Sequence, residues 1–286
     1  MPILYTLGAM RTVGLLLYAP SLRTHVVEAV AVSVCFALLA WRLKAATPAA
    51  AASGGVICLC LVYGTHVYMA SVVHSALVPL IALFALTFIA TRAGRNRKAA
   101  SGLAEGRSGR TASQVVANLG FAALFAFPLG FISLFVVPRS TVRMSSVVIF
   151  VCVTSALAEA AADTVSSEIG QAFGGSPILL TTLRPVPPGT DGAISLRGTL
   201  AGIFAAAIVA AAGRWSMHLS LRQSSIALVA GICGLFFDSL LGATLERRGW
   251  IGNDLVNFCS TAFSAALCLI VLWLVPGLGP RPCVRY

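Results

Sequence analysis

The feature that most constrains this chain is a series of apolar runs that recurs along its whole length. Nine runs can be drawn, each close to the ~20 residues that an α-helix needs to cross ~30 Å of hydrocarbon. They cover residues 3–18, 26–41, 50–68, 72–90, 115–137, 145–162, 196–213, 224–245 and 255–275. The first two are short and 69–74 is a tight join, so the pattern predicts an all-α fold, a polytopic transmembrane helical bundle of about 7–9 spans.

Charged residues are scarce, and most of them lie between the apolar runs. The chain is 58% hydrophobic and 10% charged, with a mean hydropathy of +0.92. Lys and Arg number 20 against 9 Asp and Glu, which gives a net charge of +11. Because the basic residues lie in short loops between spans, membrane topology and anionic headgroups or phosphates explain this charge better than nucleic acid does. The expected partner is therefore the lipid bilayer and not a nucleic acid.

Cysteine, histidine and serine show no pattern of a metal centre or a nucleophile. Seven of the eight cysteines lie inside apolar runs, where a thiol behaves as a small hydrophobe, and no CxxC pair occurs. The four histidines are scattered over early spans or the opposite side, so they are assigned no chemistry. The serines lack a G-x-S-x-G elbow. A zinc site, a disulfide framework and a nucleophilic triad are therefore not expected.

The basic segment 91–113 predicts the orientation of the chain. It carries six Lys and Arg residues against a single Glu105, which indicates a cytoplasmic location by the positive-inside rule. Two spans later the segment 163–195 returns to the same side, and two spans further on the segment 246–254 does so as well. The loops expected on the other side are 138–143 and 214–223. The prediction is a cell-membrane protein with its active face in the cytoplasm.

Several carboxylates lie within the apolar runs or at their ends. Glu159 and Asp163 are four residues apart and so share one helical face. An unpaired carboxylate in a span costs about 2.5 kcal/mol or more, which favours binding of a divalent cation or a proton over a structural partnership with Arg. Asp238 lies well inside its run, with Gly234 and Gly242 four residues to either side to admit close helix packing.

Glycines, hydroxyls and amides near these acids suit a phosphate. Residues 174–177 and 186–192 are rich in Gly and Pro, and Ser195 is the expected N-cap of the following helix. The Walker spacing Gly-x-x-x-x-Gly-Lys-Ser/Thr is absent. Polar stripes enter two spans, and for their Ser and Thr members plain interhelical hydrogen bonds are the favoured interpretation. The stripes consist of Asn253, Asn257 and Thr261 in one span, and Gln114 and Asn118 in another.

Five motifs, in order along the chain, resemble a single known family. They lie at 102–107 with 114–118, 162–164 with 167–170, 186–190 with 195–199, 238–244, and 253–254 with 256–258. The fourth is Asp-Ser-Leu-Leu-Gly-Ala-Thr. The family is an integral-membrane one, long known as a domain of unknown function, that includes the plant phytyl-phosphate kinase. The chain departs from it at Pro185, where relatives tend to have a basic or polar residue.

The resemblance covers about residue 45 to the last span. It implies three parts: extra N-terminal membrane segments at 1–44, a prenyl-phosphate kinase-like membrane domain at 45–276, and a short polar tail at 277–286. Residues 1–18 have no basic residue before their apolar part, which favours a first span over a cleaved signal peptide. No pattern specifies an oligomeric state.

The activity that the resemblance implies is transfer of a phosphoryl group from a nucleoside triphosphate to a membrane-embedded prenyl monophosphate. The co-substrate would be CTP or ATP, the cofactor Mg²⁺, and the acceptor a phytyl, geranylgeranyl or similar monophosphate. Catalysis is predicted at Asp163, Glu168 and Asp238, and metal binding at Glu159, Asp163, Glu168 and Asp238. Nucleotide or phosphate binding is predicted at Lys98, Arg107, Gln114, Asn118, Arg184, Gly189, Thr190, Ser195, Arg197, Asn253, Asp254 and Asn257, with Arg110 helping to neutralise the phosphates.

Two other functions remain open at this point. Glu159 and Asp238 inside spans are also typical of a proton- or cation-coupled transporter, although no inverted repeat is visible. A cytidylyltransferase-type lipid enzyme would use the same metal and phosphate groups but release pyrophosphate. Assay of the reaction products separates the three.

Overall fold

The protein is a bundle of membrane helices. The computed structural model describes residues 20–103, 109–136 and 139–275. Its helices are α2 (Pro20–Arg42), α3 (Pro48–His66), α4 (Leu77–Arg92), α5 (Arg95–Ala100), α6 (Ala112–Val136), α7 (Arg139–Phe173), α8 (Leu196–Ser216), α9 (Leu221–Leu241), the π-helical turn η1 (Gly242–Glu246) and α10 (Asn253–Leu274). Six described helices are long and apolar enough to cross a membrane, and two shorter apolar helices lie at 77–92 and 112–127. The all-α transmembrane prediction is confirmed, while the run at 3–18 lies outside the described residues.

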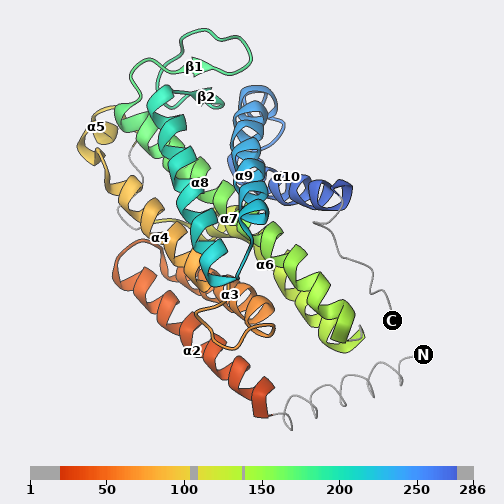
Figure 1. Ribbon diagram of the computed structural model, residues 1–286. Helices are drawn as coiled ribbons and strands as arrows, with labels where there is room; N and C mark the ends of the chain where they lie inside the picture. The colour runs from red at the N-terminus through yellow and green to blue at the C-terminus, as the bar shows by residue number, and fades with distance from the viewer. Residues whose placement is uncertain (1–19, 104–108, 137–138, 276–286) are drawn as a thin grey trace.

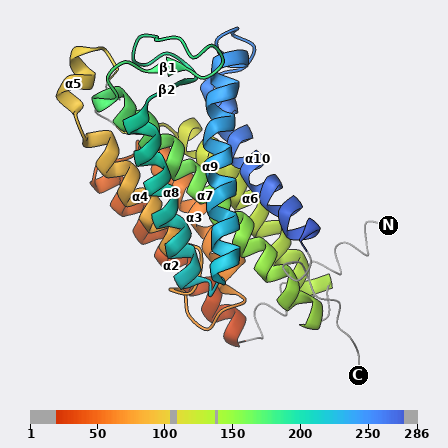
Figure 2. The same ribbon diagram turned by 45° about the horizontal axis from the view of Figure 1, so that its top comes forward.

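Successive long helices run in alternate directions, so their connections gather at two ends (Figures 1 and 2). At one end α3, α6, α8 and α10 begin, and we call it the polar end. It carries α5 and the two-stranded hairpin of β1 (Ile178–Leu179) and β2 (Ala193–Ile194), at the top of both views. At the opposite end α4 and α9 begin. The three polar segments predicted to share one face therefore do lie at the same end.

Helix α7 is the centre of the bundle. It contacts α4, α6, α8, α9 and α10, and its apolar residues from Ile149 to Ala162 are almost all buried. A helix that is apolar all round is expected in such a buried position. The helix is longer than the predicted run of 145–162, because it begins at Arg139 and ends at Phe173. Most of the loop predicted at 138–143 is thus helical, and so is the first part of the segment predicted as a loop from Asp163.

Glycines on α8 explain why α7 continues to Phe173. A Cβ atom on Gly198 would lie 2.5 Å from the carbonyl oxygen of Ser166, and one on Gly202 would lie 2.6 Å from that of Ala162. The backbones of α7 and α8 therefore approach more closely than larger residues would permit. This contact extends past Asp163 and supports the last turns of α7, so Asp163 and Glu168 project from a helix.

The loop between α7 and α8 is held against the end of α9. Its strands pair antiparallel, with Ile178 opposite Ile194. Gly192 has a φ of +71° and packs on the backbone of Ala243, while a Cβ atom on Gly242 would lie 2.7 Å from the Gly192 nitrogen. Only glycine fits both requirements at position 192, the left-handed φ and the close approach. The hairpin is thereby fixed over the end of the helix that carries Asp238.

Candidate functional site

A polar cavity of about 280 Å³ opens at the polar end, among α6, α7, α9, α10 and the loop before α8. It brings together side chains that are far apart in the sequence. Of the residues predicted to act, it is lined by Gln114, Asn118, Asp163, Glu168, Gly189, Thr190, Ser195, Asp238, Asn253 and Asn257. The prediction of a pocket built by separated segments at one end of the bundle is confirmed by this cavity.

Carboxylates from two central helices meet on its wall. The carboxylates of Asp163, on α7, and Asp238, on α9, both line the cavity and interact with each other. The hydroxyl of Ser260 donates to Oδ2 of Asp238 at 3.1 Å. Glu246 and Asp191 also line the cavity and add negative charge beside them. Carboxylates placed this close repel one another unless a proton or a cation lies between them.

Glu159 lies one turn of α7 before Asp163, next to this group but not on the cavity wall. It is 1% exposed, and neither carboxylate oxygen has a hydrogen-bond partner among the described residues. Both Asp163 and Asp238 interact with it electrostatically. Gly234 of α9 makes room for it, because a Cβ atom there would lie 2.5 Å from Cγ of Glu159. The predicted close packing of α9 beside Asp238 is confirmed by this contact.

Arg110 brings positive charge to the same wall. Its guanidinium interacts electrostatically with Asp163, and its Nη1 lies 3.5 Å from Oγ1 of Thr164. Its backbone is fixed to the connection between α2 and α3, where its N–H donates to the carbonyl of Ala45 at 3.0 Å and its carbonyl accepts from the N–H of Thr47 at 3.0 Å. Arg110 is therefore a positioned cation at the edge of an acidic cavity.

Lys98 and Glu168 form a buried ion pair with each other. Lys98 is 1% exposed, and its ammonium donates to the Glu168 carboxylate and, at 2.8 Å, to the carbonyl of Thr91. The hydroxyl of Thr91 donates to Oε1 of Glu168 at 3.2 Å. Lys98 was predicted to bind phosphate and Glu168 to bind metal. In the structure each neutralises the other, although Glu168 also reaches the cavity wall.

The amide and hydroxyl side chains are held by local hydrogen bonds. Gln114 accepts from the N–H of Thr111 at 2.8 Å, and the Asn118 amide donates to the carbonyl of Gln114 at 2.9 Å. Ser195 is the N-cap of α8, as predicted, and accepts from the N–H of Gly198 at 3.2 Å. Because Ser195 also lines the cavity, the start of α8 faces it with a partial positive charge.

Besides Glu159 and Lys98, three predicted residues within the described part of the chain do not line the cavity. Arg197 donates to the carbonyl of Phe173 at 3.0 Å, so it caps the end of α7. Asp254 is exposed in the first turn of α10, where a negative charge stabilises the helix N-terminus. Arg184 is exposed in the loop, and Arg107 lies outside the described residues. Conversely, Asp191 and Glu246 line the cavity although they were assigned no role, and each stands next to a motif that was recognised.

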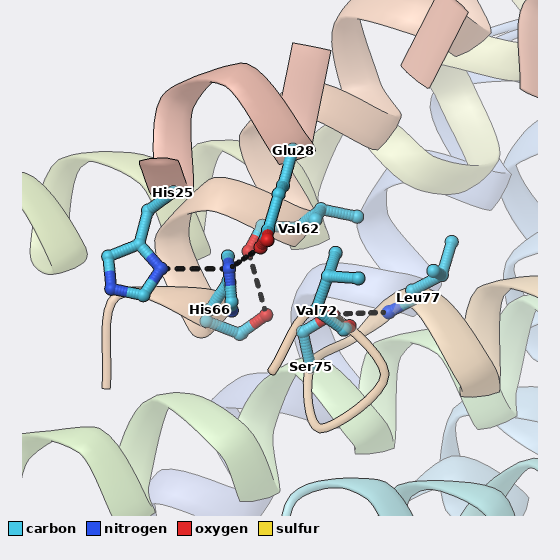
Figure 3. A network of polar contacts seen from close by, with 8 residues as sticks. His25, Glu28, Val62, His66, Val72, Ser75 and Leu77 are labelled. Carbon is cyan, nitrogen blue, oxygen red and sulfur yellow. Dashed lines mark hydrogen bonds and ion pairs between the residues drawn. The ribbon is translucent and has the colours of Figure 1, made fainter. Parts of the chain in front are cut away.

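The histidines form two pairs at the opposite end, which corrects the prediction that they are scattered. Nδ1 of His25 lies 2.8 Å from Nε2 of His66, and Oε2 of Glu28 lies 2.7 Å from the same nitrogen (Figure 3). The rings of His74 and His218 lie 4.6 Å apart. His25 and His66 are 41 residues apart in the sequence, and the antiparallel packing of α2 on α3 brings them together. Local sequence patterns do not predict a contact over this separation.

Comparison with known proteins agrees with this architecture. Residues 31–265 match the family described as "Integral membrane protein DUF92". The chain belongs to this family. The match begins within α2 and ends within α10, and it includes every residue that lines the cavity. The predicted family resemblance is thereby confirmed, and no solved structure matched the chain.

Three relatives show how far the similarity extends. An uncharacterized membrane protein of Synechocystis is 32% identical over 66% of this chain and 71% of its own length. An uncharacterized membrane protein of Methanocaldococcus jannaschii is 30% identical over 68% of this chain and 75% of its own length. The chloroplastic protein VTE6 of Arabidopsis thaliana is 30% identical over 66% of this chain, which spans 56% of that relative's length.

Proposed function

We propose that this protein is a prenyl-phosphate kinase that works at the polar end of its helix bundle. It would move a phosphoryl group from CTP or ATP to a prenyl monophosphate held in the membrane. The observation that carries the proposal is the cavity in which Asp163, Asp238 and Glu246 converge beside Arg110. The family resemblance supports it, since the five motifs that suggest the kinase contribute residues to this cavity.

The donor atoms around the cavity fit Mg²⁺. This ion prefers oxygen ligands, and it is usually held by one or two carboxylates together with substrate phosphates. Asp163 and Asp238 interact with each other across the cavity wall and would share a cation without strong mutual repulsion, with Glu159 adding negative charge behind them. When bound, Mg²⁺ would neutralise charge on the phosphate oxygens.

The remaining groups have roles that follow from the anionic substrates. A monophosphate acceptor is already an anion near neutral pH, so the main obstacle is repulsion between acceptor and nucleotide and not the lack of a base. Arg110 would reduce this repulsion on the acceptor side. Asn118 and Asn257 would orient phosphate oxygens, and the start of α8 with Thr190 would bind the nucleotide phosphates.

The proposal places the polar end in the cytoplasm, where nucleoside triphosphates are supplied. The basic residues of α5 lie at this end, as the positive-inside rule requires. The prenyl tail would stay in the bilayer while its phosphate lies at the level of the cavity.

The test is a transfer assay with the purified full chain, labelled ATP or CTP, Mg²⁺ and farnesyl or geranylgeranyl monophosphate. We expect the corresponding diphosphate as product. Asp163→Asn or Asp238→Asn should lower kcat by at least about 100-fold, because each removes charge from the centre of the site. The matched control is Glu28→Gln, which neutralises an acid at the opposite end and should leave kcat unchanged. Folding of each variant is checked by its melting temperature in detergent.

One observation favours a second function, cation-coupled transport. Glu159 is a buried carboxylate in a spanning helix, as in many proton pathways. Proteoliposomes without nucleotide separate the two functions. Solute or proton flux that depends on Glu159, with no phosphoryl transfer to any prenyl monophosphate, would reject the kinase. Release of pyrophosphate would instead indicate a cytidylyltransferase.

A further inference from the structure

A second cavity of about 200 Å³ lies beside the polar one, between α2, α3, α4 and α6. We call it the apolar groove. Most of its wall is hydrocarbon and aromatic, including Phe36, Ala50, Leu80, Leu83 and Phe84. Within the described residues, Arg110, Asn118 and Thr164 line both the apolar groove and the polar cavity. These three side chains are therefore the boundary between a hydrocarbon-lined space and an acidic one.

Aromatic rings lead along the groove toward a basic opening. Phe36 packs edge-on against Phe84 with ring centroids 5.3 Å apart, and Phe84 stacks with Phe88 at 5.8 Å. The guanidinium of Arg92 lies 3.5 Å from the centroid of the Phe88 ring. Lys44 and Arg95, both exposed, line the same opening. The surface thus changes from hydrocarbon to cationic over a few side chains.

We propose that the apolar groove binds the isoprenoid tail of the acceptor, with its phosphate at Arg110, Asn118 and Thr164. This inference rests on the proposed function and adds where the acceptor lies. A prenyl monophosphate has one anionic end and one branched apolar end, and the groove together with its basic opening is complementary to both. Its phosphate would then face the carboxylates of the polar cavity, where the nucleotide is bound.

In a membrane, such a groove would discriminate between apolar chains by their shape and length. Lipid tails are as apolar as the lining of the groove, so moving a prenyl chain from the bilayer into it gains little hydrophobic free energy. What the groove contributes is packing against a fixed wall, which holds the phosphate in one position for attack. Chain-length preference should therefore depend on the space left by small residues on α3.

Ala50 and Gly54 of α3 provide that space. Ala50 is buried on the groove wall, and a Cβ atom added to Gly54 would meet only Cγ1 of Val115 at an ordinary 3.8 Å. A larger side chain at Ala50 would therefore enter the volume proposed for the tail. Ala52 is exposed on the same helix and does not line the groove, so it offers a matched control.

The kinetic test compares Ala50→Leu with Ala52→Leu on geranyl, farnesyl and geranylgeranyl monophosphates. Ala50→Leu should raise KM for the longest acceptor by about 10-fold and change KM for the shortest much less. KM for the nucleotide should stay as in the natural chain, and Ala52→Leu should behave like the natural chain throughout. An unchanged length preference in a folded Ala50→Leu protein would overturn the proposal.

A labelling experiment tests the groove without relying on turnover. The probe is a farnesyl monophosphate analogue with a diazirine at the end of its tail, irradiated with the full chain in lipid nanodiscs. We expect labelled peptides that contain Phe36 or Phe84, and competition by farnesyl monophosphate but not by farnesol. Labelling of these peptides without phosphoryl transfer would support the groove as the binding site of the tail and would reject the proposed kinase activity. Phosphoryl transfer together with labelling only at exposed residues such as Trp273 would reject tail binding in the groove but not the kinase activity.

Discussion

At the scale of single residues, the pairing of Lys98 with Glu168 changes what each side chain can do. Both had been assigned to ligands, one to phosphate and one to metal. The ammonium also donates to the carbonyl of Thr91, and the carboxylate accepts from the Thr91 hydroxyl, so much of their bonding capacity is used within the protein. The pair ties the last turn of α5 to α7, and its carboxylate lies on the wall of the polar cavity.

A buried ion pair of this kind predicts a specific pattern of stability. Lys98→Met should lower the free energy of unfolding by about 3–5 kcal/mol, because it leaves the Glu168 carboxylate buried without its cation. The double variant Lys98→Met/Glu168→Met should recover most of this loss, since both charges are then gone. The measurement is unfolding by denaturant in detergent. A double variant as unstable as Lys98→Met alone would show that the pairing is not the source of the effect.

At the scale of elements, the position of the site depends on the close contact of α7 and α8. The contact is made by glycine, and the obstacles to a larger residue are backbone carbonyls, which cannot rotate away as a side chain can. It sets where Asp163 and Glu168 stand relative to Ser195, the N-cap of α8.

Gly202→Ala tests this contact. Alanine has a helix propensity about 1 kcal/mol better than glycine, so an exposed position would be stabilised by the change. Here the new methyl would lie 2.6 Å from the Ala162 carbonyl oxygen, and overpacking should lower stability by about 1–3 kcal/mol. The control is Gly54→Ala in the interior of α3, where the added carbon would meet only Cγ1 of Val115 at an ordinary 3.8 Å. Equal melting temperatures for the two variants would contradict the close packing.

At the scale of the whole molecule, alternation of helix direction brings four helix starts and the carboxylates together at one end. The cavity, the basic α5 and the hairpin all lie there, and the connection between α8 and α9 lies at the other end (Figure 2). In the proposed reaction, a single membrane face would therefore serve both the nucleotide and the acceptor phosphate.

The sidedness of this arrangement can be measured in cells. Short epitope tags inserted at Ser101, Gly189 and Gly249 should all be protected until the membrane is opened, because these positions share the polar end and that end is proposed to be cytoplasmic. A tag at Ser220, between α8 and α9, should be accessible from outside. Any one of the first three tags reporting the outer face would contradict a single site at the polar end.

The sequence alone determined that this protein lies in a lipid bilayer and that its fold is all-α. It also identified the polar residues that were candidates for a functional site. Hydropathy and residue spacing are local properties, so they located the spans, the N-cap Ser195 and the acids Asp163 and Asp238. The family motifs then grouped residues that the cavity indeed brings together. Even the end on which they meet followed from counting spans, because each crossing reverses the direction of the chain.

Only the tertiary structure decided which of these side chains touch each other. Lys98 and Glu168 are 70 residues apart, and their pairing depends on how α5 and α7 are rotated and packed. The continuation of α7 to Phe173 depends on the glycines of another helix. The apolar groove could not be predicted from the sequence either. Its wall is formed by several helices, and each of them would be apolar simply because it crosses the membrane. Contacts of this kind follow from packing in three dimensions, which local patterns of hydropathy do not encode.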